Sequence, residues 1–239
     1  MVGIGPGPIA RQTKEALDII ASSEVILGYQ LYLGLIRDLI KDKEVYSSGM
    51  GQEEERCRKA IDLARTGKKV ALLSSGDTGV YGMAGLVLEI MAKEGLDINL
   101  EIIPGVPSAN TAAARLGAPL MLDYATISLS DLLVPWELIE KRLVAAASSD
   151  MVIVLYNPKS KDRQWQLSKA QEIILRYRSA VTPVGIVADA GRDDERVVIT
   201  TLGRLGEEDI SMRSIVIIGN STTFRYQDWL ITPRGYRLI

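Results

Sequence analysis

Short apolar runs alternate with amphipathic segments along the first half of the chain, and this alternation constrains the fold most. The apolar runs, which predict buried strands, lie at residues 1–5, 24–27, 69–74 and 98–103. Helical patterns occupy residues 11–22, 31–40, 53–66, 80–94 and 108–116. Because strands separated by helices pair in parallel, we expect a mostly parallel sheet covered by helices.

The pattern changes at Gly117-Ala118-Pro119, which we take as a domain boundary. It separates an N-terminal α/β domain, residues 1–117, from a C-terminal α/β domain, residues 118–239. In the second domain we expect strands at 125–129, 151–156, 183–188, 196–201 and 213–218, and helices at 136–147 and 164–178. The last two strands are close enough in sequence to pair antiparallel, so this domain should have a mixed sheet.

The composition excludes several classes of chemistry. The 239 residues include no histidine, which excludes Ser-His-Asp triads, Cys-His pairs and His-based zinc sites. A single cysteine, Cys57, excludes intramolecular disulfides and cysteine-cluster metal sites, and it fits a reduced, cytoplasmic setting. Acid–base chemistry must therefore use Asp, Glu, Lys, Tyr or backbone groups.

The charge balance argues against two kinds of partner. A net charge of −2 gives no overall field for nucleic acid or anionic membranes. No apolar run reaches membrane-spanning length. We expect neither a nucleic-acid partner nor a membrane partner.

Three glycine-rich loops follow predicted strands of the first half, at residues 3–7, 74–82 and 104–110. The first lacks the third glycine of a dinucleotide-binding fingerprint because Pro8 stands there, which disfavours a nicotinamide oxidoreductase. The second offers backbone groups to a small polar ligand, although an N-cap at Asp77 or Thr78 explains it equally well. The third, taken alone, is better explained by close helix packing.

Polar loops also end three strands of the second half, at residues 128–131, 156–163 and 189–192. Taken one at a time, their side chains are better explained as helix caps or solvated charges. Together they place Lys159, Lys161, Arg163 and Arg192 beside a candidate cleft of an otherwise acidic chain.

Taken together, these loops resemble the tetrapyrrole methylase family of cobalamin-pathway methyltransferases, and the resemblance extends from Gly3 to Tyr236. Widely shared motifs are GIGPG, SSGDTGVYGMAG and PGVPSAN. More specific are SLSDLLVPWE and VLYNPKSKDRQWQL, which are accompanied by TPVGIVADAGR, IIGNS and TPRGY. These motifs indicate the members that methylate carbon 17 of the ring and contract it.

The resemblance implies an α/β fold with a mostly parallel N-terminal sheet, a mixed C-terminal sheet and an active-site cleft between the two domains. It implies S-adenosylmethionine (SAM) as cofactor, a tetrapyrrole as substrate and a homodimer. The composition, with no histidine and one cysteine, leads us to expect no bound metal. The residues expected to bind the cofactor are Gly76, Asp77, Thr78, Val80, Tyr81, Pro107, Ser108, Tyr156, Asn157, Gly185 and Ala188.

The remaining expected roles concern the substrate. Gly5, Pro6 and Gly7 should face the tetrapyrrole, and the four basic residues at 159, 161, 163 and 192 should pair with its carboxylates. Ring contraction needs proton movement, for which Asp131 is the candidate. Ser130 or Tyr156 would position a peripheral oxygen of the substrate.

Two departures from the family pattern leave alternatives open. Thr78 stands where the family usually has proline, and Pro107 stands where threonine or serine is common. A catalytically silent tetrapyrrole-binding protein of the same fold therefore stays open. So does a methyltransferase of a different step, such as the methylation of precorrin-4 at carbon 11.

Overall fold

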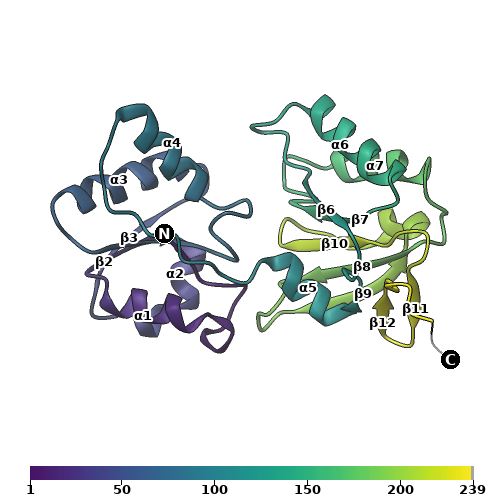
Figure 1. The fold of residues 1–239 in the computed structure, drawn as a ribbon, viewed down its shortest axis with the longest axis horizontal. Coiled ribbons are helices and arrows are strands. Elements are labelled where there is room, and N and C mark those ends of the chain that lie inside the picture. Colours follow the sequence, from purple (N-terminus) through teal and green to yellow (C-terminus); the bar gives the residue numbers. More distant parts are fainter. Residues whose placement is uncertain (238–239) are drawn as a thin grey trace. The chain divides into compact units, whose positions relative to one another are not determined.

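The first unit of the chain, Met1–Ser108, is built on four parallel strands (Figure 1). The computed structural model describes residues 1–237. From one edge of the sheet to the other, the strands are β1 (Val2–Gly3), β4 (Val70–Ser74), β2 (Val25–Tyr29) and β3 (Glu44–Ser48). Side chains alternate between the two faces, so Ile26 and Leu73 pack on one side while Leu27 and Leu72 pack on the other.

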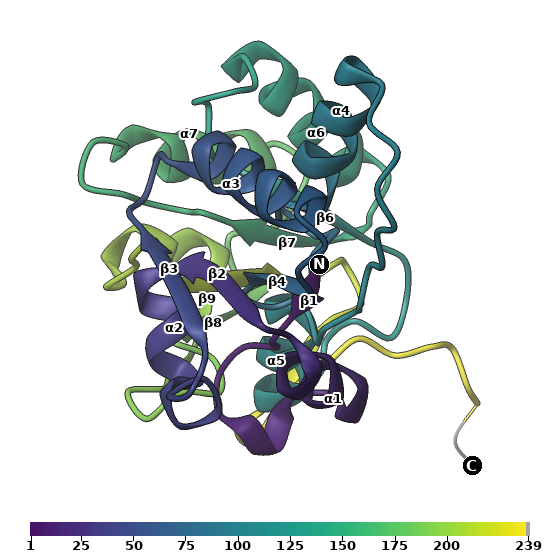
Figure 2. The ribbon, with the colours of Figure 1, turned by 90° about the vertical axis from the view of Figure 1, so that its left-hand side faces the viewer.

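Helices cover both faces of this sheet, as the apolar pattern requires. Helices α1 (Lys14–Ser22) and α2 (Gln30–Leu35) cover one face, and α3 (Glu53–Arg65) and α4 (Ala84–Glu94) cover the other (Figure 2). Short 3-10 turns, η1 (Ile9–Arg11) and η2 (Arg37–Leu39), precede α1 and follow α2.

The second unit begins at Ala109 and holds a mixed sheet of five strands. In spatial order these are β6 (Tyr124–Ser128), β7 (Val152–Tyr156), β10 (Ser214–Ile218), β8 (Pro183–Ala188) and β9 (Arg196–Thr201). β6 and β7 are parallel, and each later neighbour is antiparallel. Helices α6 (Trp136–Ser148) and α7 (Trp165–Leu175) cover one face together with the turn η3 (Leu202–Glu207).

A small three-stranded sheet completes the second unit. Its order is β11 (Phe224–Tyr226), β12 (Trp229–Ile231) and β5 (Gly117–Ala118). β5 follows helix α5 (Ser108–Leu116) directly and pairs in parallel with β12. This pairing ties the segment after α5 to the C-terminal end of the described chain.

The division between the units falls one helix before the expected boundary at 117/118. Helix α5 packs with the second unit because the Ala109 N–H donates to the Tyr156 hydroxyl at 3.0 Å. At its other end, Leu116 lies against Gly185 of β8.

Several sequence expectations for individual elements were wrong. Residues 98–103 form no strand apart from a single bridge at Ile103. The strands at 196–201 and 213–218 do not pair with each other, because β8 lies between β9 and β10. Strand β3 was missed because its exposed, polar sequence gives no buried-strand signal. Helix α4 begins after the expected residue 80 because Tyr81 has a φ of 54°, which a helix does not accommodate.

None of the helices within residues 1–237 is both long enough and apolar enough to cross a membrane.

Candidate functional site

Backbone hydrogen bonds join the first two glycine-rich loops at the carboxyl ends of β1 and β4. Gly5 N–H donates to Gly76 O at 3.1 Å, and Gly76 N–H donates to Gly5 O at 2.8 Å. Both glycines have positive φ, 66° and 64°, which a residue with a Cβ rarely adopts. The reciprocal pairing therefore depends on glycine at both positions. It places the two sequence motifs side by side.

Asp77 holds the second and third loops together. One of its carboxylate oxygens accepts the Gly79 N–H at 2.8 Å, and the other accepts the Gly105 N–H at 3.0 Å. The sequence nominated Asp77 both as an N-cap and as a cofactor residue. Its position shows a third role, in which the side chain fixes the spacing between the second and third glycine-rich loops.

Thr78 supplies an unsatisfied polar atom in the second loop. The residue is 1% exposed, and its Oγ1 atom has no hydrogen-bond partner among the described residues. Leaving a buried hydroxyl without a partner costs free energy, so the atom is suited to a ligand. Val80 follows in the same loop, and Tyr81 is half-exposed with its left-handed backbone.

The third loop leads into helix α5 beside the second loop. Pro107 and Ser108 are partly buried, and a Cβ built on Gly76 would lie 3.6 Å from both the backbone nitrogen and the Oγ of Ser108. The three loops of the first unit that the sequence singled out therefore come together.

The hydroxyl of Tyr156, expected to position a substrate oxygen, has a structural partner. It accepts the N–H of Ala109 in the first turn of α5. The first N–H groups of a helix have no partners within the helix, so this bond satisfies one of them. The Tyr156 side chain itself is buried.

The loops after β6 and β7 are joined by side chains. Asn157, which has a φ of 50°, donates from Nδ2 to Ser128 Oγ at 2.9 Å. Nη1 of Arg163 donates to the carbonyl oxygens of Leu129 and Asn157, at 3.1 and 3.0 Å. The Ser130 N–H donates to the same Ser128 Oγ at 3.2 Å.

Asp131 ends this loop cluster and has a partner that sequence reasoning missed. Nε2 of Gln166 in α7 donates to Asp131 Oδ2 at 3.0 Å. Gln166 is 2% exposed, and its Oε1 has no hydrogen-bond partner among the described residues. The available signal was a polar residue beside Leu167 in the buried stripe of an amphipathic helix.

The four basic residues nominated for substrate carboxylates fall into two groups. Arg163 bonds backbone carbonyls, and Arg192 lies 3.5 Å from the buried Asp189 carboxylate. The side-chain ammonium groups of Lys159 and Lys161 make no hydrogen bond or ion pair with any described residue. The ammonium groups of these two lysines are therefore available to bind an anion from outside the chain.

Gly185 and Ala188 lie on β8, within the five-stranded sheet. A Cβ on Gly185 would lie 2.6 Å from Leu116 Cδ2 and 2.8 Å from Leu230 Cδ1. Close packing of these leucines therefore requires glycine at this position. Ala188 is partly buried at the end of the strand.

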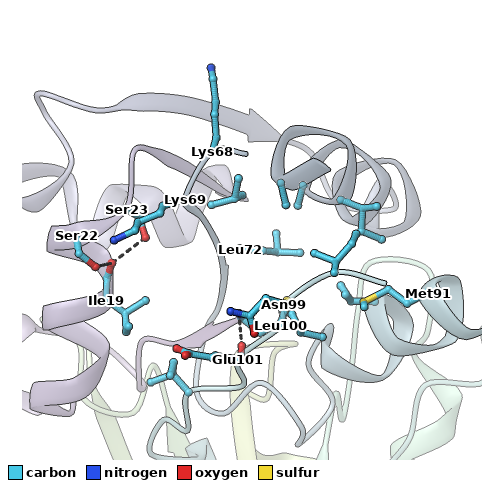
Figure 3. A pocket seen from close by; sticks show the side chains of 18 of the residues that line it. Ile19, Ser22, Ser23, Lys68, Lys69, Leu72, Met91, Asn99, Leu100 and Glu101 are labelled. Carbon is cyan, nitrogen blue, oxygen red and sulfur yellow. Dashed lines mark hydrogen bonds between the residues drawn. The ribbon is translucent and has the colours of Figure 1, made fainter. Parts of the chain in front are cut away.

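A cavity of about 490 Å³ lies in the first unit, away from these loops (Figure 3). Its lining includes Met1, Ser23 and Lys69, which come just before or at the amino ends of β1, β2 and β4. None of the residues nominated from the sequence lines it. Across residues 1–237, no group of three or more Cys, Asp and Glu side chains is arranged to hold a metal ion.

Comparison with known proteins identifies the family. Residues 1–206 match the family model described as Tetrapyrrole (Corrin/Porphyrin) Methylases. The chain belongs to the tetrapyrrole methylase family. The predicted fold class is confirmed, because solved methylases share the parallel N-terminal and mixed C-terminal sheets.

Two curated proteins are similar to this chain over nearly its whole length. The chain is 49% identical over 238 residues to a probable cobalt-factor III C(17)-methyltransferase of Salmonella typhimurium, covering 100% of this chain and 99% of that protein. It is 48% identical to a cobalt-factor III methyltransferase of Priestia megaterium, covering 99% of this chain but 45% of that longer protein.

Two solved structures of methyltransferases are similar to this chain in fold. The methyltransferase CobJ superposes with a TM-score of 0.92 at 32% identity, covering 97% of this chain and 98% of the other. A uroporphyrin-III C-methyltransferase of Thermus thermophilus, complexed with S-adenosylhomocysteine, has a TM-score of 0.68 at 22% identity, over 91% and 95% of the two chains, and shows the shared fold.

Proposed function

We propose that this methylase transfers a methyl group from SAM to carbon 17 of cobalt-factor III or precorrin-3B, with contraction of the ring. The supporting observation is the 49% identity to the Salmonella protein over essentially the full length of both chains. The agreement with CobJ along nearly the whole chain supports the same assignment.

The residues of the second loop fit the polar end of SAM. The buried, unpartnered hydroxyl of Thr78 can donate to a carboxylate or accept from an ammonium group. The backbone around Gly76 is held in place by Gly5 and Asp77, so ordering this loop costs little on binding. Threonine in place of the usual proline thus offers a polar group to the cofactor, so this departure does not favour the silent-binder alternative.

The cofactor residues nominated from the sequence remain our proposal. In the first unit these are Gly76, Asp77, Thr78, Val80, Tyr81, Pro107 and Ser108. In the second they are Tyr156, Asn157, Gly185 and Ala188. When bound, SAM supplies an electrophilic methyl group on sulfur.

The chain's own task is to orient the ring carbon, exclude water and move a proton during contraction. We propose Asp131 for the proton, because its Oδ2 is held by Gln166 while the residue is partly exposed. Ser130 is its neighbour in the same loop. Gly5, Pro6 and Gly7 are proposed on the substrate side.

Lys159 and Lys161 are proposed to meet substrate carboxylates, since their charges have no partner among the described residues. Arg163 and Arg192, nominated with them, are assigned instead to holding the loops, because each has partners within the chain.

The deciding experiment is anaerobic incubation of the protein with SAM and cobalt-factor III, and with metal-free precorrin-3B in parallel. Mass spectrometry and carbon-labelled NMR should show one added methyl at carbon 17 and a contracted ring. The preferred substrate then shows whether cobalt is already present. Methylation at another carbon would favour the different-step alternative, and no binding of S-adenosylhomocysteine would favour the silent binder.

The role of Asp131 is tested with Asp131→Asn and Gln166→Leu. Asp131→Asn should lower kcat about a hundredfold at unchanged KM for SAM if it moves the proton. Gln166→Leu removes the positioning bond and should lower kcat about tenfold. Full turnover of Asp131→Asn would eliminate this role.

We also propose a homodimer, to be checked by light scattering of the purified protein.

A further inference from the structure

Arg56 of helix α3 is a buried cation without an acidic partner among the described residues. It is 5% exposed, and no carboxylate of residues 1–237 forms an ion pair with it. The other buried arginine, Arg178, is 7% exposed and pairs with Asp150. Buried charges in proteins are normally paired, so Arg56 departs from the usual pattern.

Every hydrogen-bond acceptor of the Arg56 side chain among the described residues is an uncharged atom. Nη2 donates to Gly49 O at 2.8 Å, Nη1 contacts Met83 Sδ at 3.3 Å, and Nε donates to Ser48 Oγ. A guanidinium has five N–H groups. Two of them, one on each Nη atom, therefore have no acceptor among the described residues.

The glutamates that precede Arg56 on α3 are engaged elsewhere. Glu53 accepts the Gly51 N–H at 3.2 Å, and Glu54 pairs with Arg58 at 2.9 Å. Glu55 accepts from Gln52 at 3.3 Å. The positive charge is thus not balanced by its own helix.

Arg56 lies next to the second glycine-rich loop, which is proposed to bind the cofactor. Its partner Met83 directly follows the second glycine-rich loop, and Ser48 ends strand β3 at the carboxyl edge of the sheet. The carbonyl of Gly49 accepts from the guanidinium, and the same turn continues with the 61% exposed Met50 and with Gly51.

We propose that Arg56 recognises a carboxylate of the tetrapyrrole substrate. The two remaining N–H groups lie one on each Nη atom, and a guanidinium binds a carboxylate in bidentate fashion with one N–H from each of these atoms. The ligand would supply the missing counter-charge, and Met50 would meet the apolar part of the same ligand. This inference rests on the proposed function, which gives the substrate its carboxylates.

The test compares Arg56→Gln and Arg56→Lys with wild type in steady-state turnover of cobalt-factor III. Arg58→Gln is the matched control, because it removes the same charge two residues away on an exposed part of the helix. We expect Arg56→Gln to raise KM for cobalt-factor III about thirtyfold and to leave KM for SAM within about twofold. Arg56→Lys keeps the positive charge but lacks the planar guanidinium with its paired donors. Its KM for cobalt-factor III should therefore lie between those of wild type and Arg56→Gln. Arg58→Gln should behave as wild type.

A second measurement needs no variant, so a folding defect cannot obscure the result. Hydrogen exchange of the wild-type protein with cobalt-factor III, without SAM, should show protection of residues 48–56. No protection there would overturn the inference. Unchanged KM for cobalt-factor III in folded Arg56→Gln, or an equal rise of both KM values, would also overturn it. Absence of turnover and of cobalt-factor III binding in wild type would instead show that the proposed function fails.

Discussion

Gly3 and Gly105 lie in direct backbone contact although they follow different segments of the first unit. A Cβ built on Gly3 would lie 2.6 Å from the Gly105 nitrogen, and one built on Gly105 would lie 2.7 Å from the Gly3 carbonyl carbon. Because both faces of this contact are backbone, neither can move aside as a flexible side chain would. The contact explains why the first and third loops have glycine at positions 3 and 105, and it makes the spacing of these loops sensitive to a single methyl group.

Gly105→Ala should therefore destabilise the protein by about 3 kcal/mol. The added methyl would also overlap the carbonyl oxygen of Gly76, which pairs with Gly5. Urea unfolding of both proteins measures the difference. Gly85→Ala is the control, because Gly85 lies in α4 with no atom near its Cβ position, and alanine there should stabilise by about 0.5 kcal/mol. Equal effects of the two substitutions would contradict the close-contact explanation.

Tyr156→Phe should cost about 1 kcal/mol of stability, because it leaves the Ala109 N–H of α5 without its acceptor. Thermal unfolding checks this against Tyr177→Phe, whose exposed hydroxyl bonds no described residue. Turnover of the folded Tyr156→Phe variant should stay within about threefold of wild type, since the hydroxyl serves the helix. A much larger loss of turnover would mean that the hydroxyl also acts on the substrate.

Arg163→Ala should raise KM for SAM and for the tetrapyrrole by similar factors, about fivefold each, because one guanidinium holds the carbonyls of Leu129 and Asn157. Steady-state kinetics with each ligand varied in turn gives both values. Arg176→Ala removes an exposed arginine side chain that has no partner among the described residues, and it serves as control. A rise confined to the tetrapyrrole would instead assign Arg163 to the substrate, as the sequence alone suggested.

Asp150→Asn should reduce stability at pH 7 by about 1 kcal/mol, a modest value because the Asp150 side chain is 42% exposed and its interactions are screened. Asparagine tolerates the left-handed backbone at this position, where φ is 56°, so the substitution removes the charge and one acceptor without straining the backbone.

The pH dependence follows from the pKa of Asp150. Burial raises that pKa, but hydrogen bonds from Ser221 and the charge of Arg178 outweigh burial and hold it below its ordinary value. Burial also lowers the pKa of Arg178, yet arginine stays charged throughout this range, so the carboxylate governs the effect.

A carboxylate with a lowered folded-state pKa contributes stability above its ordinary pKa and loses it as the pH falls through the folded value. The difference between wild type and Asp150→Asn should thus narrow towards about pH 3. Urea unfolding across this range measures it, with the exposed Asp62→Asn as control. A difference that stays constant with pH would rule out the ionised pair as its source.

The elements that the sequence predicted best are those with a strong local signal. Strand β7 lies entirely in a buried apolar run, and helix α5 was predicted with its observed bounds. Strand β3 and the pairing of β9 were not predictable in the same way. β3 is an exposed edge strand without an apolar pattern, and β9 pairs with β8 rather than with β10. Pairing depends on which strand lies between, and that is not encoded in sequence separation.

The candidate site likewise has features that the sequence predicted and features that it did not. The glycine-rich motifs and the polar loops after strands were visible in the sequence, because turn geometry leaves its mark on residue type. The partners of their side chains were not. Arg163 looked like a free cation and bonds two backbone carbonyls, whereas Gln166 looked like an ordinary helix residue and holds Asp131.

The sequence by itself determined the α/β class, the loops that follow the strands and the family, since apolar periodicity and glycine positions are local properties of the chain. The tertiary structure decided which polar groups are left without partners. Thr78 Oγ1, the amide oxygen of Gln166 and the two remaining N–H groups of Arg56 emerge only when distant segments have packed. The physical reason is that a hydrogen bond or a charge pair is satisfied by whatever lies near it in space, and burial then fixes the cost of each group left over.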